Sequence, residues 1–83
     1  MDKRRFTIDA PISGTFYKQP SPEEGAYVQL GDKVKKKDVV CIVETMKIFN
    51  EVRAERPGVV REILIEDEDA VMTGQPMIVL EEI

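Results

Sequence analysis

The sequence predicts an all-β domain in which two small antiparallel sheets pack face to face, one from each half of the chain with some exchange of strands. Three observations support this fold class. Short runs rich in valine and isoleucine recur about every eight to twelve residues and are separated by turn-forming residues. No segment has helical periodicity of useful length. The two halves of the chain can also be aligned with each other, which indicates an internal repeat.

The expected strands are apolar runs that are bounded by residues favouring turns. In chain order, these strands cover residues 27–30, 39–43, 49–54, 59–65 and 77–80. The breaks between them are supplied by Gly31-Asp32, Lys37-Asp38, Pro57-Gly58 and Gly74-Gln75-Pro76. The run at 39–43 has no polar alternation, which is typical of a strand that is covered on both faces.

An internal repeat relates the first half of the chain to the second. Residues 10–16 align with residues 54–60, and residues 32–44 align with residues 69–81. Because a repeat this short cannot cover its own apolar face, we expect the two copies to share one core. The first half carries seven extra residues at about 18–24, which predicts an insertion. Chance similarity between two β-rich segments is the alternative interpretation.

The length and composition exclude several classes of function. A chain of 83 residues has room for one modest core, so we expect a single domain over residues 1–83 without a deep catalytic cleft. It contains no histidine, which removes Ser-His and Cys-His nucleophile pairs and imidazole metal sites. Cys41 is the only cysteine, so an internal disulfide is excluded. It aligns with Ile78 and is interpreted as a core residue, with a reactive thiol as the alternative.

The charge pattern predicts neither nucleic-acid binding nor a membrane segment. The net charge is -4, and the sequence lacks a broad basic patch interleaved with aromatic residues. A lysine cluster at 33–37 and an acidic run at 66–69 are expected to lie on solvated turns. No apolar stretch is long enough for a membrane span, and the charged start at 1–5 is not followed by the apolar run of a signal peptide. The expected location is therefore the cytoplasm.

Lys47 lies at the expected bend between two strands and is the candidate functional residue. A two-residue turn at Met46 and Lys47 would direct the lysine side chain into solvent. Neither residue is glycine or asparagine, so ordinary residues would be held at positive φ, which is a mildly strained conformation. An ordinary solvated lysine in a loop is the alternative interpretation. The apolar residues that this turn would pair across the two strands are Val40 and Ile42 on one side and Val52 and Ala54 on the other.

The sequence around this lysine resembles the attachment sequence of biotin carboxyl carrier domains, which belong to the biotin/lipoyl attachment superfamily. The resemblance rests on Glu44-Thr45-Met46-Lys47-Ile48 at the junction of the two halves, and it covers nearly the whole chain. The Pro-Ile-Ser-Gly and Arg-Pro-Gly turns and the Cys-Ile-Val-Glu segment before the motif agree with it. The stretch Gly-Thr-Phe-Tyr-Lys-Gln-Pro-Ser-Pro-Glu at 14–23 is similar to the protruding thumb of the carrier from bacterial-type acetyl-CoA carboxylase.

The resemblance implies a flattened β-barrel or sandwich of two four-stranded antiparallel sheets with quasi-twofold symmetry. The modified lysine would lie on an exposed hairpin turn, opposite the termini. The resemblance also implies that a biotin protein ligase attaches biotin to Lys47. The biotin would then carry carboxylate from a biotin carboxylase to a carboxyltransferase, as part of a non-catalytic component of acetyl-CoA carboxylase in fatty-acid synthesis. The implied cofactor-binding residues are Lys47, Met46, Thr45, Glu44 and Ile48, with Gln19 and Pro20 of the thumb.

Two other functions stay open. Met46, at the position just before the lysine, resembles the residue found there in biotin domains, because lipoyl domains usually carry aspartate at this position. Glu44-Thr45, however, also resembles the lipoyl pattern, so a lipoyl carrier domain of a 2-oxo acid dehydrogenase or glycine cleavage system is the first alternative. An unmodified β-domain that only binds a protein partner is the second. Gln19 stands where the family more often has threonine, which leaves the contact between the thumb and biotin open.

Overall fold

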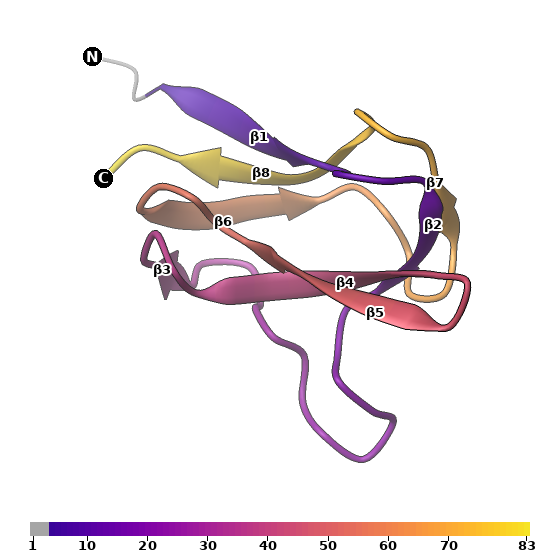
Figure 1. Cartoon of the computed structure of the whole chain (residues 1–83). Coiled ribbons are helices and arrows are strands. Elements are labelled where there is room, and N and C mark those ends of the chain that lie inside the picture. Colours follow the sequence, from indigo (N-terminus) through magenta and orange to yellow (C-terminus); the bar gives the residue numbers. More distant parts are fainter. Residues whose placement is uncertain (1–3) are drawn as a thin grey trace.

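The computed structural model describes residues 4–83, so residues 1–3 of the charged N-terminal run and of the expected 1–83 domain lie outside the described part. The strands of this described part are β1 (Arg5–Asp9), β2 (Gly14–Tyr17), β3 (Lys33–Val34), β4 (Val39–Thr45), β5 (Ile48–Arg53), β6 (Gly58–Ile63), β7 (Ala70–Val71) and β8 (Pro76–Glu81). They form two four-stranded antiparallel sheets that face each other in a flattened sandwich (Figure 1). Within residues 4–83, no helix is long and apolar enough to span a membrane.

The strand orders show the quasi-twofold relation between the halves. One sheet has the order β1-β8-β6-β3 and the other β5-β4-β2-β7, so moving each label by four strands converts one sheet into the other. The expected exchange of strands between one sheet per half is confirmed and involves half of the strands, because each sheet takes two strands from each half. In the described part, the chain changes sheet at every connection except the β4–β5 hairpin. Each half thus supplies the two central strands of one sheet, β2 and β4 or β6 and β8, and the two edge strands of the other sheet.

Two glycines explain how the strands approach each other at equivalent places in the repeat. A Cβ atom on Gly14 would overlap with the carbonyl oxygen of Glu44 and lie 3.0 Å from its carbonyl carbon. A Cβ atom on Gly58 would lie 3.0 Å from the carbonyl oxygen of Glu81. Glu44 and Glu81 are themselves aligned in the repeat, near the ends of β4 and β8. The same close backbone contact therefore occurs twice, and a side chain at either glycine would push two strands apart.

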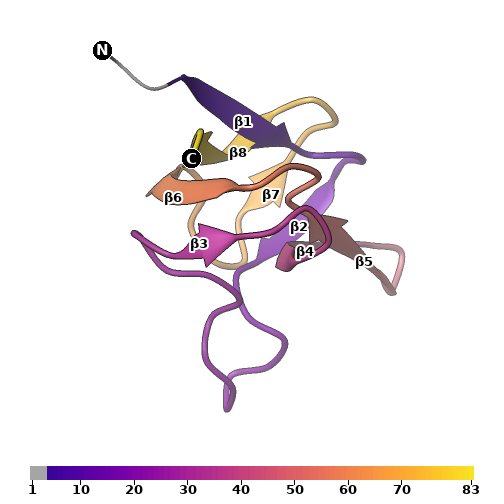
Figure 2. The same cartoon turned by 90° about the vertical axis from the view of Figure 1, so that its left-hand side faces the viewer.

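Four of the expected strands correspond to β4, β5, β6 and β8, whereas the one expected at 27–30 is absent. The chain turns there, because the Gln29 N–H donates to the Asp32 carboxylate at 2.9 Å and the Asp32 N–H donates to the Gln29 carbonyl at 3.0 Å. Val28 is nevertheless buried. The apolar residues at 27–30 therefore belong to a loop that packs on the core. The extra residues at 18–24 lie on the loop between β2 and β3 that projects from the sandwich, as Figure 2 shows.

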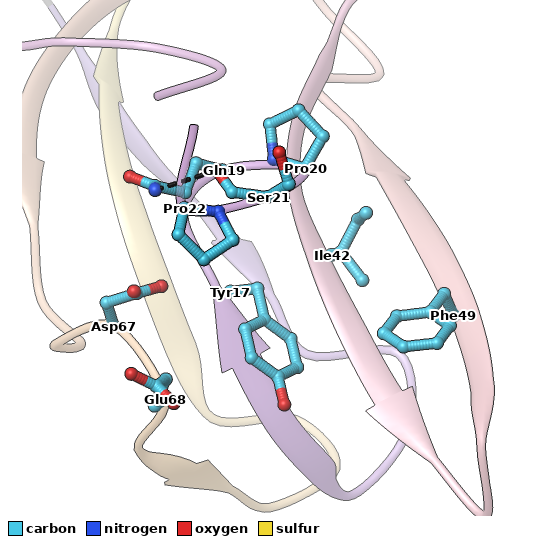
Figure 3. A pocket seen from close by; sticks show the side chains of 9 residues that line it. All are labelled: Tyr17, Gln19, Pro20, Ser21, Pro22, Ile42, Phe49, Asp67 and Glu68. Atoms are coloured by element: carbon cyan, nitrogen blue, oxygen red, sulfur yellow. Dashed lines mark hydrogen bonds between the residues drawn. The ribbon is translucent and has the colours of Figure 1, made fainter. Parts of the chain in front are cut away.

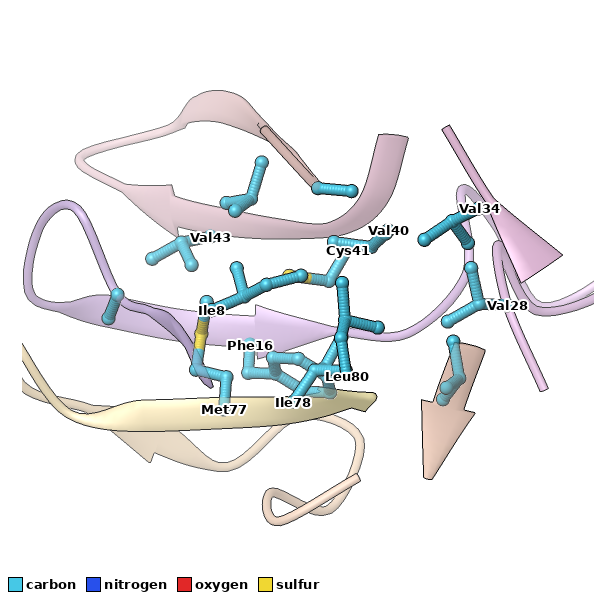
Figure 4. Packing of buried hydrophobic residues seen from close by; sticks show 14 of the residues in the cluster. Ile8, Phe16, Val28, Val34, Val40, Cys41, Val43, Met77, Ile78 and Leu80 are labelled. Carbon is cyan, nitrogen blue, oxygen red and sulfur yellow. The ribbon is translucent and has the colours of Figure 1, made fainter. Parts of the chain in front are cut away.

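The core fills the space between the two sheets (Figure 4). Residues 40–43 of β4 and 77–80 of β8 are all buried, which confirms that the expected apolar runs are covered on both faces. Cys41 and Ile78, the aligned pair of the repeat, are both fully buried. The largest fully buried side chains are Phe16, Met77, Ile78, Leu80, Val40, Val43, Val60 and Cys41.

The burial of the Cys41 thiol supports the interpretation of Cys41 as a core residue. It also predicts how the stability of the fold depends on pH. Burial raises the pKa of this thiol from 9.0 to about 12. The thiol therefore stays neutral in the folded state at pH values where it ionises in the unfolded chain. Its contribution to stability is complete below about pH 9 and is lost as the pH rises toward about 12, with a slope of about 1.4 kcal/mol per pH unit. We expect Cys41→Val to remove this slope in denaturant unfolding measured between about pH 8 and pH 10. An unchanged pH dependence in the variant would contradict the burial argument.

Candidate functional site

The candidate site is the turn of the β4–β5 hairpin, which lies at the opposite end of the sandwich from the two termini (Figure 1). Met46 and Lys47 form a two-residue turn with φ angles of 51° and 64°, which confirms the predicted positive φ at both positions. Thr45 pairs with Ile48 immediately below the turn. Both turn residues are exposed, and Met46 has 91% of its surface accessible.

The register of this hairpin differs by one residue from the expected pairing. Cys41 pairs with Val52 and Ile42 pairs with Glu51. The expected pairing of Ile42 with Val52 is therefore wrong, because a two-residue turn requires Thr45 to face Ile48 and fixes every pair below it. An irregularity between Val39 and Cys41 then shifts the register near the start of β4.

Exposed apolar residues flank Lys47 in the chain, and its amine forms no ion pair with residues 4–83. None of the ion pairs formed within residues 4–83 involves Lys47. Its neighbours Met46 and Ile48 are exposed, as is Phe49, which is the next residue along β5. The Asn50 side chain donates to the carbonyl oxygens of Val43 at 3.2 Å and Ile48 at 3.3 Å. These hydrogen bonds connect the two strands near the turn and stabilise the hairpin. The exposed Lys47 at its tip is accessible to a partner.

Tyr17 of β2 connects the neighbouring strand to both arms of the hairpin. Its hydroxyl donates to the Glu44 carboxylate at 3.0 Å, and its ring centroid lies 6.2 Å from that of Phe49. Glu44 and Phe49 face each other across the hairpin. The hydrogen bond to Glu44 is the main cause that raises the pKa of the Tyr17 hydroxyl. Sequence reasoning missed Tyr17, Phe49 and Asn50 as site residues. Only the pairing of β2 with β4 brings Tyr17 to the hairpin, whereas Phe49 and Asn50 follow the motif directly in the chain.

A cavity of about 330 Å³ lies between the loop after β2 and the outer face of the sheet (Figure 3). Gln19 and Pro20, two of the residues implied by the resemblance, line it together with Phe49 of the hairpin. Lys47 is not among the lining residues. The structure therefore brings the loop beside Ile42 and Phe49 in the two arms of the hairpin rather than to the turn itself. The full lining is Tyr17, Gln19, Pro20, Ser21, Pro22, Ile42, Phe49, Asp67 and Glu68.

The arrangement can present an amine, and any chemistry at that amine needs groups from another molecule. No group of three or more metal-ligating side chains was found in the described range 4–83. No residue of this chain is placed to remove a proton from the Lys47 amine through a hydrogen bond among those found within residues 4–83. The accessible amine fits a group that is attached through an amide bond.

A family model described as "Biotin-requiring enzyme" matches residues 6–80, which is most of the chain. The chain belongs to the biotin-requiring enzyme family. Its relatives in this family include the biotin carboxyl carrier protein of acetyl-CoA carboxylase from Haemophilus influenzae, which is 49% identical over 74 residues. That match covers 89% of this chain and 48% of the relative. The protein with the same description from Chlamydia trachomatis is 50% identical over 70 residues, which cover 84% of this chain and 43% of the relative.

The chain thus spans about half the length of these curated members of the biotin-requiring enzyme family. The resemblance to the carrier of bacterial-type acetyl-CoA carboxylase is confirmed by these relatives. Among solved structures, a Kluyveromyces lactis urea carboxylase matches with a TM-score of 0.77 and 29% identity over 96% of this chain and 6% of that one. A single-chain, multi-domain long-chain acyl-CoA carboxylase matches with a TM-score of 0.79 over 95% of this chain and 7% of that one. At 18% identity, this second match supports the fold alone.

Proposed function

We propose that residues 1–83 form a single biotin carboxyl carrier domain that is covalently biotinylated on Lys47. A biotin protein ligase attaches the cofactor. The domain then moves carboxylate from a biotin carboxylase to a carboxyltransferase, as a non-catalytic component of an acetyl-CoA carboxylase in fatty-acid synthesis. The observation that carries this proposal is the exposed Lys47 at the tip of a two-residue turn, in a chain 49% identical to a carrier protein of that enzyme.

The chain's own contribution is to present the amine and to hold it away from competing groups. A lysine amine is normally protonated at neutral pH, so the ligase must remove a proton before the nitrogen attacks an activated carboxyl group. The hairpin offers the amine on an exposed turn, where it has no ion pair with any residue in the described range 4–83. Biotin, once bound through an amide, supplies the ureido ring that accepts and donates carboxylate. Because the group stays tethered, its local concentration at each partner active site is high without new contacts.

The remaining motif residues have supporting roles in this proposal. Glu44, Thr45, Met46 and Ile48 flank the acceptor lysine and form the surface that the ligase reads. Gln19 and Pro20 line the cavity beside the hairpin, where the biotin ring can rest between transfers. The cavity is large enough and apolar enough at Phe49 for a small ring system, which supports this assignment.

Intact-mass spectrometry separates this function from the two alternatives. The domain is co-expressed with a biotin protein ligase in one culture and with a lipoyl ligase in another. We expect a biotin adduct in the first and no adduct in the second. A lipoyl adduct would identify a lipoyl carrier domain instead. An unmodified mass in both cultures would support a β-domain that only binds a protein partner.

The residue before the lysine gives a sharper test of cofactor choice. We expect Met46→Asp to lower kcat/KM for biotinylation by about tenfold, equivalent to about 1.4 kcal/mol of transition-state binding. The reason is that a charge replaces an exposed apolar side chain next to the amine. The fold should be unchanged, because Met46 is in contact with solvent. Met72→Asp is the matched control, since Met72 is also exposed and lies outside the hairpin. Equal rates for the two variants would show that Met46 does not select biotin.

The loop at 18–24 is expected to be dispensable for folding and for attachment. Deleting it should leave a domain that unfolds cooperatively and accepts biotin, because the second half of the repeat makes the equivalent connection without these residues. The Lys18 N–H does donate to the Asp67 carboxylate at 2.9 Å, so a loss of stability of about 1 kcal/mol is expected. Urea unfolding and intact mass together check both parts. A variant without a cooperative transition would mean that the loop is structural.

A further inference from the structure

The Glu44 side chain is held in place by a residue from a different strand. Glu44 lies three positions before Lys47, near the end of β4, and is half-buried. The Tyr17 hydroxyl donates to its carboxylate at 3.0 Å, while the Tyr17 ring contacts Phe49 on the other arm. Since Glu44 and Phe49 face each other, one side chain touches both members of a cross-strand pair. Only the Thr45–Ile48 pair separates this contact from the turn.

We propose that Tyr17 is a positioning residue for the ligase, because its hydroxyl fixes the Glu44 carboxylate beside the acceptor turn. This inference rests on the proposed function and extends it to a residue outside the motif. A glutamate side chain has several rotamers, and holding it in one of them costs free energy when a partner binds. A hydrogen bond to an ionised carboxylate is stronger than one between neutral groups and orders the side chain in advance. The ligase then meets a negative charge at a fixed place relative to the Lys47 amine.

Two further features agree with this role. The contact with Glu44 raises the pKa of the Tyr17 hydroxyl, so the donor keeps its proton throughout the neutral pH range. None of the ion pairs formed within residues 4–83 involves Glu44, so no lysine or arginine competes with the tyrosine for the carboxylate. Tyr17 pairs with Ile42 through the backbone, which places its ring on the outer face of the sheet together with Glu44.

Tyr17→Phe removes the hydroxyl and keeps the ring against Phe49. We expect this variant to raise the KM of the ligase for the domain about fivefold with kcat unchanged, since one long side chain must then be ordered on binding. The lost hydrogen bond should lower the melting temperature by only about 5 °C. Tyr27→Phe is the matched control, because Tyr27 is the other tyrosine of the chain, is also half-buried and lies outside the hairpin. A KM that is unchanged by Tyr17→Phe, or raised equally by Tyr27→Phe, would overturn the proposal.

A double-mutant cycle shows whether Tyr17 acts through Glu44. In a Glu44→Ala background, Tyr17→Phe should have no further effect on KM, whereas additive effects would mean that Tyr17 acts by another route. NMR scalar couplings of the Glu44 side chain give a measurement that needs no ligase. They should report one rotamer in the unmodified wild type and an average over several in Tyr17→Phe. Couplings that show several Glu44 rotamers in the wild type itself would refute the claim that the carboxylate is held in one place. If the wild type accepts no biotin, the proposed function fails. The couplings still show whether Tyr17 holds the Glu44 side chain in one rotamer.

Discussion

Replacing Lys47 with arginine is expected to abolish the biotin adduct completely and to leave the fold intact. Arginine keeps the positive charge and a similar length, but its guanidinium is always protonated and is not a nucleophile under these conditions. Lys47 is exposed on a turn and forms none of the ion pairs found within residues 4–83, so its replacement removes no stabilising contact among these. Intact mass after co-expression with biotin protein ligase, together with the melting temperature, measures both effects.

The matched control for this experiment is Lys36→Arg. Lys36 is also exposed, but it lies in the connection between β3 and β4, away from the acceptor turn. This variant should carry the adduct in full. A biotin adduct that persists in Lys47→Arg would place the attachment site on another lysine, and peptide mapping of that material would identify which one.

Gly14→Ala is expected to have the largest effect on stability. A Cβ atom at this position would overlap with the Glu44 carbonyl oxygen and lie 3.1 Å from a Val43 methyl carbon. Since β2 is paired with β4 on one side and with β7 on the other, the backbone has little room to move. We expect a loss of about 3 kcal/mol, at the upper end of the range for overpacking. For a domain of this size, that loss lowers the melting temperature by roughly 15 °C.

Gly25→Ala provides the control for the Gly14 substitution. Gly25 lies in the loop between β2 and β3, and a Cβ atom there would have no heavy atom within 4 Å. Its φ is not positive, so alanine should be neutral or stabilise the domain by a few tenths of a kcal/mol. Urea unfolding of the two variants gives the change in the free energy of unfolding for the same Gly→Ala substitution at a closely packed site and at a site without neighbouring atoms. Equal stabilities would show that the close approach of β2 and β4 can relax.

Much of the site could be predicted because its signals are local in the chain. The turn at Met46 and Lys47, with positive φ at both residues, follows from the spacing of the apolar runs on either side. The burial of Cys41 follows from its place in a continuous apolar run and from its alignment with Ile78. The apolar run at 27–30 predicted a strand, but the structure has a loop there with Val28 buried. There the turn formed by Gln29 and Asp32 overrode the apolar pattern.

The features that could not be predicted depend on contacts between distant residues. The strand β1 has charged residues at both ends and only one buried residue, Ile8, so its composition does not indicate a strand. Its conformation comes from pairing with β8, which lies at the other end of the chain. The contact of Tyr17 with Glu44 spans 27 residues and likewise has no local signal.

The sequence by itself determined the all-β class, the internal repeat and the choice of Lys47 as the candidate acceptor, because hydrophobic spacing, turn residues and a short motif are properties of neighbouring residues. The tertiary structure decided how the halves interleave, with two strands of each half in each sheet. It also decided the place of Tyr17 and of the loop at 18–24 beside the hairpin. These features depend on which strands pair, and pairing between distant strands is set by the packing of the whole core.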